Sequence, residues 1–402
     1  MEKDYRNAHY VSQCVDHFLE GEPILTPAYN LQLVKQFDGE VTLAEVNQSV
    51  GNIITDKNQV FVMYGPDKEG FVIPSESEIE ATVLAAQKKQ YEPYQEEKIP
   101  STLMSALPKP GKIVSEKPYG KFGMTEITLS NGMKVYVKPT DYQADQVMMS
   151  MRAEGGTSLY GNEDIPNFSL LTSAITEAGV GDFSATALRK ALAGKSIRLT
   201  PSISSEGQRI TGSSSVKDME TMFQLAHLYF MAPRKDSVAF EGLKNRTLSF
   251  LKNRNASSKV VYNDSLSAVL YDHNLRMAPV TGEVLAKADY GRIMEIYRER
   301  FSDASNFKTV FIGKIDMAEL RPLLCQYLAT LPSTYKKEET DKKNVPQIVM
   351  KNEKVKFVHQ QETPLANVSV FYAGNVPFSP KNDLVLDVLT QSDFPERDYC
   401  MV

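Results

Sequence analysis

The spacing of apolar residues predicts a chain that opens with helices and then forms a strand. The stretch "TLAEVNQSVGNIITD" (42–56) places apolar residues at helical intervals. Thr42 and Glu45 stand at the spacing of a capping box, so we expect a helix that begins directly after Thr42. The run "QVFVMYG" (59–65) is apolar and of strand length, which predicts a strand.

The pattern changes between Pro74 and Gly123. A charged segment, "SESEIEATVLAAQKKQ" (75–90), predicts a helix. Five prolines follow within "YEPYQEEKIPSTLMSALPKPGKIVSEKPYG" (91–120). Because proline lacks a backbone N–H and restricts its neighbour, this tract favours an extended inter-domain linker over a core element.

From Thr125 onward the pattern is that of an α+β domain. The stretch "TEITLSNGMKVYVKPT" (125–140) predicts a hairpin, with Asn131-Gly132 supplying the positive φ angles of a type I′ turn. Further strands are expected at 146–156, 196–205, 207–215 and 306–313. Helices are expected at 167–179, 184–194, 216–231 and 236–254, with more helix up to Phe301 and again over 316–333.

The helix expected over 216–231 has one apolar face, which we predict to lie in the core. Its members are Met219, Met222, Phe223, Ala226 and Phe230. His227 stands beside this face and is predicted to be a half-buried structural residue.

One arrangement occurs twice. Helix, Asp, polar spacer, apolar strand and Gly appear as "IITDKNQVFVMYG" (53–65) and as "RFSDASNFKTVFIG" (300–313). A separation of about 250 residues is too long for a solenoid and favours a duplicated domain plus linker. After residue 353, two strands (354–360 and 367–374) and a helix (381–391) are expected, too little to bury a core of their own.

These patterns predict four segments. Residues 1–73 are read as the C-terminal part of one domain, 74–123 as a linker, 124–340 as a complete domain, and 354–402 as the start of a further domain. The chain is thus expected to be cut at both ends.

Composition narrows the class of protein. The 402 residues are 42% apolar and 24% charged, as in soluble globular proteins. The net charge of −5 gives no reason to expect nucleic acid as a partner. Three widely spread cysteines make no disulfide framework, and no apolar run is long enough to predict a membrane span.

The stretch "HFLEG" (17–21) comes within one residue of H-x-x-E-H, the motif that places two zinc ligands and a general base on one helix face. Gly21 stands where the second His would be. The chain has five His in all, and no two of them are close enough in sequence to share an ion. We therefore interpret "HFLEG" as an ordinary surface segment and not as a metal site.

Several segments together carry a family resemblance: "ITLSNGMKVYVKPT", "GGTS", "FSATALRKALAGKS", "FMAPR" and "NFKTVFIGKIDMAELRPLLCQYLATLPS". In this order they resemble the pitrilysin/insulinase zinc metallopeptidases, above all large bacterial zinc proteases. The resemblance implies pitrilysin-like α+β domains, duplicated, each with an antiparallel-rich sheet packed with helices. It also implies a clamshell of four domains around a peptide, with zinc held by H-x-x-E-H in the first.

The resemblance places this chain outside that catalytic domain. The complete domain carries Leu170, Ser173 and Ala174 where the family's catalytic domains carry His, Glu and His. The segment expected to hold the third ligand, "RTLSFLKN" (246–253), contains no acidic residue. We therefore expect no catalytic and no metal-binding residue here; substrate contacts cannot be assigned from the sequence.

The function implied is that of the non-catalytic half of a zinc endopeptidase, enclosing peptide substrate opposite the zinc. Zinc belongs to the catalytic half, the partners are the peptide and that half, and the chain alone is expected to be inactive. Two alternatives stay open: a free-standing non-catalytic subunit that partners an active chain, and a structural core-type subunit. Localisation is left open, since a signal peptide of an exported parent would lie upstream of Met1.

Overall fold

The structure, a computed structural model, describes residues 7–53, 58–65, 72–90, 92, 99–100, 102–359 and 366–393. The chain divides into two compact units, Met1–Glu97 and Lys98–Val402. The first unit contains four helices among its described residues: α1 (Asn7–Glu20), α2 (Pro27–Phe37), α3 (Leu43–Ile53) and α4 (Glu76–Lys88).

The predicted capping box at Thr42 is confirmed. The Thr42 N–H donates to Glu45 Oε2 at 2.8 Å, and the Glu45 N–H donates to Thr42 Oγ1 at 3.2 Å. Ser75 and Glu78 form a second capping box at the start of α4. The strand predicted at 59–65 is wrong, because these residues are not paired with any strand that the structure describes. Val60 and Tyr64 are 84% and 91% exposed, so the segment lacks both a ladder and a core to cover it.

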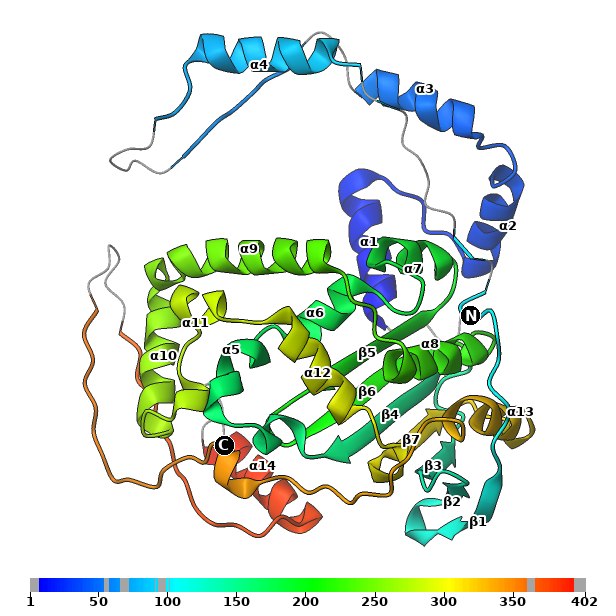
Figure 1. Cartoon of the computed structure of the whole chain (residues 1–402). Coiled ribbons are helices and arrows are strands. Elements are labelled where there is room, and N and C mark those ends of the chain that lie inside the picture. Colours follow the sequence, from blue (N-terminus) through cyan, green and yellow to red (C-terminus); the bar gives the residue numbers. More distant parts are fainter. Residues whose placement is uncertain are drawn as a thin grey trace. The chain divides into compact units, whose positions relative to one another are not determined.

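The second unit is built on a seven-stranded sheet with the order β1-β2-β3-β7-β4-β6-β5 (Figure 1). Within this sheet β3 and β7 pair in parallel, and the other neighbours are antiparallel, as predicted for this fold class. The strands are β1 (Ile113–Tyr119), β2 (Met124–Leu129), β3 (Lys134–Pro139), β4 (Val147–Glu154), β5 (Ile197–Ile203), β6 (Gly207–Ser214) and β7 (Lys308–Gly313).

The helices of this unit follow the predicted order. They are α5 (Ile165–Phe168), α6 (Leu171–Ala178), α7 (Ala185–Ala191), α8 (Met219–Met231), α9 (Ser237–Asn253), α10 (Ser258–Leu270), α11 (Gly282–Ala286), α12 (Tyr290–Arg300), α13 (Met317–Leu323) and α14 (Pro380–Asp393). A π-helical turn, Leu324–Leu328, continues α13.

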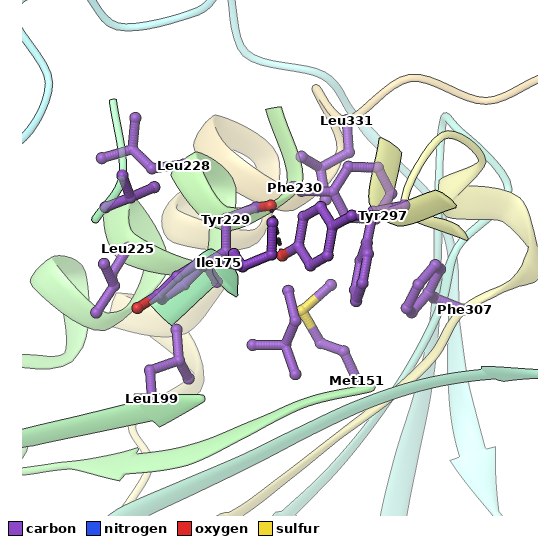
Figure 2. Close-up of a cluster of buried hydrophobic side chains, with 14 of the residues drawn as sticks. Met151, Ile175, Leu199, Leu225, Leu228, Tyr229, Phe230, Tyr297, Phe307 and Leu331 are labelled. Carbon is purple, nitrogen blue, oxygen red and sulfur yellow. Dashed lines mark hydrogen bonds between the residues drawn. The ribbon is translucent and has the colours of Figure 1, made fainter. Parts of the chain in front are cut away.

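The core lies on one face of the sheet. Val147, Met149 and Met151 of β4 are buried, whereas Met148 and Arg152, which alternate with them along the strand, are exposed. Helices α6 and α8 pack against β5, and α8 also packs against β6. Figure 2 shows how side chains from these helices, from α12 and from the strands meet, with the Tyr297 hydroxyl donating to the Tyr229 carbonyl at 2.9 Å. The opposite face of the sheet therefore carries side chains that the helices of this core do not cover.

The predicted hairpin β2–β3 is confirmed, but its turn is not type I′. Gly132 has a φ of +84°, while Asn131 is not among the residues with positive φ. The Gly132 N–H donates to the Leu129 carbonyl and the Leu129 N–H donates to the Met133 carbonyl, the pattern of a type I turn followed by a bulge. The Asn131 side chain is thereby free to donate to the carbonyls of Leu328 and Leu331 at 2.8 and 3.0 Å.

Two further expectations differ from the structure. Part of the tract predicted as linker, Ile113–Tyr119, forms the edge strand β1 and pairs with β2. Residues 354–359 and 367–374 do not form the predicted strands, and Gln360 lies outside the described residues. The exposed side chains of Val358 (80%) and Val368 (88%) indicate why: no strand or helix in the described part of the chain covers them. The helix predicted at 381–391 is present as α14.

Candidate functional site

The "HFLEG" stretch lies at the C-terminal end of α1. The helix ends at Glu20, and Gly21 leaves it with a φ of +74°. The exposed His17 ring donates from Nδ1 to the Glu22 carbonyl at 2.7 Å. The second His of an H-x-x-E-H motif would therefore take the place of Gly21, the residue at which the chain leaves the helix, and would not lie on the helix face. The geometry gives "HFLEG" a capping role.

The position expected for a zinc helix is α6, and there the side chains are apolar. Leu170, which directly precedes α6, is 3% exposed, and Ala174 in its first turn is 1% exposed. Both belong to the hydrophobic core, while Ser173 between them is only half-buried. None of the three can coordinate zinc and activate its bound water as His and Glu do.

Helix α9 packs against α6, as a third-ligand helix would have to. One contact between the two helices is an ion pair: Arg246 Nη2 of α9 lies 3.0 Å from Glu177 Oε2 of α6. Both side chains are largely exposed, so this ion pair contributes little to stability. Among the residues that the structure describes, no three His, Cys, Asp or Glu side chains lie close enough together to hold a metal ion.

His227 is more deeply placed than the sequence predicts. Its exposed fraction is 7%, and its Nδ1 donates to the Tyr327 carbonyl at 2.9 Å. Tyr327 lies in the π turn after α13, where a widened helix frees carbonyl groups for such side-chain donors. Burial lowers the pKa of His227, and the hydrogen bond to the carbonyl only partly offsets this. The neutral ring thus links α8 to the π turn.

A second polar cluster closes the C-terminal end of β4. Arg300 donates from Nε to the Tyr160 hydroxyl at 2.9 Å and pairs with Glu338 at 2.7 Å. The Tyr160 hydroxyl donates to Glu299 at 2.7 Å. Burial, together with this hydrogen bond, raises the pKa of Tyr160, so the phenol stays protonated. Every member has a partner, which is typical of a structural network and not of a reactive site.

The described surface also has a shallow hollow between α9 and α11. Leu248, Leu251, Lys252, Thr281, Gly282 and Glu283 line it. It is open to solvent, and its lining residues include no cluster of titratable groups aimed at one point. The hollow therefore does not have the features of an active site.

No helix in the described part of the chain is long and apolar enough to cross a membrane.

The positions at which the sequence analysis expected zinc ligands lie where α6 packs against α9, but the side chains there are not metal ligands. Sequence reasoning missed a cationic face of the sheet, because this face becomes visible only once the register of four strands is known.

Comparison with known proteins gives the relationship. No family model matches the chain. A zinc protease PQQL-like of Arabidopsis thaliana is 25% identical over 321 residues, which is 79% of this chain and 31% of that protein. The crystal structure of the periplasmic protease PqqL from Escherichia coli superimposes with a TM-score of 0.56 at 18% identity, over 87% of this chain and 38% of that chain.

A second solved structure has the same fold. A mutant of the ferredoxin protease FusC, in complex with Arabidopsis ferredoxin, matches with a TM-score of 0.55 at 15% identity, over 85% of this chain and 38% of that chain. The chain thus spans about a third of the length of the relatives it matches. It is related in sequence to the PqqL-like zinc proteases and has the fold of the pitrilysin-type peptidases.

Proposed function

We propose that this chain is a non-catalytic part of a pitrilysin-type zinc endopeptidase, and that it encloses the peptide substrate opposite the zinc. Zinc and the water that it activates would belong to the catalytic part of the same enzyme. The chain's own contribution would be a wall that excludes water and offers hydrogen-bonding surface to the peptide.

One observation carries the proposal: a domain with its sheet and helices in place has apolar side chains where a zinc helix needs ligands. Leu170 and Ala174 fill the core, and Arg246 of α9 pairs with Glu177 of α6. A domain that had merely lost one ligand would keep the others; here the two expected His positions hold core residues, and the segment expected to hold the third ligand, 246–253, has no acidic residue. The fold of a domain and the catalytic residues that it carries are separate properties, and this domain has the fold without the expected zinc ligands.

The domain organisation is part of the proposal. Residues 1–73 would be the end of a preceding domain, the residues from 74 up to β1 a linker, and 354–402 the beginning of a following domain. The sheet domain would include β1, which lies before the boundary at residue 124 that the sequence predicts.

The proposal is tested by reconstitution. The full 402-residue chain is mixed with the H-x-x-E-H part of the same enzyme, and hydrolysis of a fluorogenic peptide is measured for each part alone and for the mixture. We expect activity in the mixture only, and no stoichiometric zinc on this chain after dialysis. Replacing the Glu of H-x-x-E-H by Gln in the other part should abolish the activity, whereas Ser173→Ala in this chain should leave the rate unchanged.

Two outcomes would contradict the proposal. Peptide hydrolysis by this chain alone, with one tightly bound zinc per chain, would show an independent active site. Full activity of the H-x-x-E-H part without this chain would leave the chain no enclosing role.

A further inference from the structure

Four cationic side chains stand in one row across the centre of the sheet. Arg209 of β6 is paired with Arg152 of β4. Arg152 is paired with Lys308 of β7, and Lys308 is paired with Lys134 of β3. The row therefore crosses four neighbouring strands without a break, and we call these four residues the cationic row.

The cationic row lies on the face of the sheet opposite the core. Its neighbours along the strands, such as Met151, Thr309 and Val135, are fully buried on the other face. All four cations are exposed. Within the described part of the chain, Arg152 and Lys308 have no ion pair or side-chain hydrogen bond. Arg209 donates to the Ser202 hydroxyl at 3.0 Å, and Lys134 lies 3.8 Å from Glu126.

The same face is cationic beyond the row. By strand register it also carries Lys117, Lys138 and Arg198, while its acidic residues on the strands are Glu126 and Glu154. Glu126 is 6% exposed and is already engaged by Lys117 at 3.4 Å. The whole chain has a net charge of −5, so the positive charge of this face is opposite in sign to the net charge of the chain.

Such a row is unfavourable for the fold by itself. Like charges directly opposite each other on neighbouring strands destabilise a sheet, and here three consecutive pairs are of this kind. With strands about 4.8 Å apart, the row extends about 14 Å, the length of four to five residues of extended polypeptide. An acidic segment laid along the row would neutralise the repulsion that the sheet otherwise carries.

We propose that the cationic row binds an acidic, extended segment of a polypeptide substrate. This inference rests on the proposed function and specifies the class of peptide that the enclosing surface prefers: one with several Asp or Glu residues within about five positions. Guanidinium and ammonium groups donate charge-assisted hydrogen bonds to carboxylates. The hydroxyls of Ser150 and Thr211, in the next row of the register on this face, add further donors.

The same face is poorly suited to single-stranded nucleic acid, which binds by stacking its bases on exposed aromatic rings as well as by charge. The aromatic ring nearest the row, Tyr136, is half-buried and packs edge-to-face with Tyr119 at a centroid distance of 4.8 Å. Burial, and after it the negative charge of Glu126, raises the pKa of the Tyr136 phenol. Tyr119 is 43% exposed, but it lies on β1, two strands away from Lys134, so the row itself has no series of open rings among the described residues.

The experiment measures binding of a labelled oligo-glutamate peptide to the full chain by fluorescence anisotropy, at low and at high salt. An oligo-glutamine peptide of the same length and an oligo-thymidine strand serve as comparison probes. The test variant carries Arg152→Glu with Lys308→Glu, and a milder variant carries Arg152→Gln with Lys308→Gln. The matched control carries Lys287→Glu with Arg298→Glu, two exposed cations outside the sheet, so the change in net charge is the same.

We expect salt-dependent binding of oligo-glutamate and none of oligo-glutamine. Affinity should fall at least about tenfold in the reversal variant, by less in the neutral variant, and less than about twofold in the control. Far-ultraviolet circular dichroism checks that each variant is folded. Equal affinity of the wild type and the neutral variant for oligo-glutamate, or tighter row-dependent binding of oligo-thymidine, would overturn the inference.

The two proposals fail differently. Row-dependent binding of oligo-glutamate by a chain that does not support peptide hydrolysis in reconstitution would refute the proposed function and leave the cationic row as a binding surface. The reconstituted enzyme could instead cleave acidic and neutral peptides equally, with the same rate in the reversal variant. That result would support the proposed function and refute the binding role proposed for the cationic row.

Discussion

The guanidinium of Arg300 and the carboxylate of Glu338 form an ion pair of 2.7 Å in which the arginine side chain is only 6% exposed. Burial acts to lower the pKa of Arg300, but Glu338 and Tyr160 more than compensate, and the net shift is upward. The pair ties the segment after β7 and α13 back to the end of α12. The buried guanidinium of Arg300 therefore needs the carboxylate of Glu338 as its counter-charge.

Removal of that partner should be costly. We expect Glu338→Ala to lower the free energy of unfolding by about 3 kcal/mol, because it leaves a buried guanidinium without its counter-charge. Urea unfolding of the full chain measures the change. Glu339→Ala is the matched control: its partner Lys337 is 82% exposed, so solvent screens this ion pair and its loss should leave the free energy of unfolding nearly unchanged. Equal effects of the two substitutions would contradict this account of Arg300.

His227 should make stability depend on pH in a defined direction. Because burial lowers its pKa, the folded protein holds the ring neutral at pH values where the unfolded chain already binds a proton. The stabilisation is therefore complete above the unfolded pKa of about 6.5 and is lost as the pH falls toward the folded value. Urea unfolding at pH 7.5 and pH 5 should show a larger loss for the wild type than for His227→Gln. An identical loss in both proteins would assign the acid sensitivity to other groups.

Restoring the zinc motif should damage the domain without creating a site. The triple change Leu170→His, Ser173→Glu, Ala174→His places two imidazoles at core positions that are 3% and 1% exposed. Overpacking and buried polar nitrogens should cost at least about 3 kcal/mol of stability. We expect no stoichiometric zinc by metal analysis, since the expected ligand segment of α9 offers no acidic residue. A folded triple variant that holds one zinc and cleaves peptide would show that α6 and α9 still form a metal cradle. Ser173→Glu alone, at a half-buried position, is the tolerated control.

The segment before α14 should exchange its backbone hydrogens quickly. Residues 366–379 form no helix or strand, and Val368 and Tyr372 are 88% and 84% exposed. Hydrogen exchange followed by mass spectrometry should show rates close to those of an unstructured peptide there, against strong protection at Met149 and Met151 of β4. Protection of 366–379 equal to that of β4 would mean that these residues pair with a partner strand in solution.

Local signals in the sequence were sufficient for some elements and insufficient for others. The capping box at Thr42 and the hairpin at Asn131-Gly132 depend on residues within a few positions, and both are present. The apolar runs at 59–65, 354–360 and 367–374 resemble strands, but a strand also needs a partner, which composition cannot supply. For the same reason the sequence did not show how deeply His227 is buried or that four cations form a row, since both depend on which distant segments become neighbours.

The place of β7 between β3 and β4 also has a consequence during synthesis. β3 and β4 are consecutive in the chain, yet they do not pair with each other; the gap between them is filled by Lys308–Gly313, made much later. Until that strand leaves the ribosome, β3 and β4 lack the strand that pairs with both of them, so we expect two half-sheets, each with an unpaired edge at that position. Pairings of such long sequence separation form slowly, and open edges attract other chains. We therefore expect the centre of the sheet to close last, and a nascent chain stalled before β7 to be recognised by chaperones through its open edges.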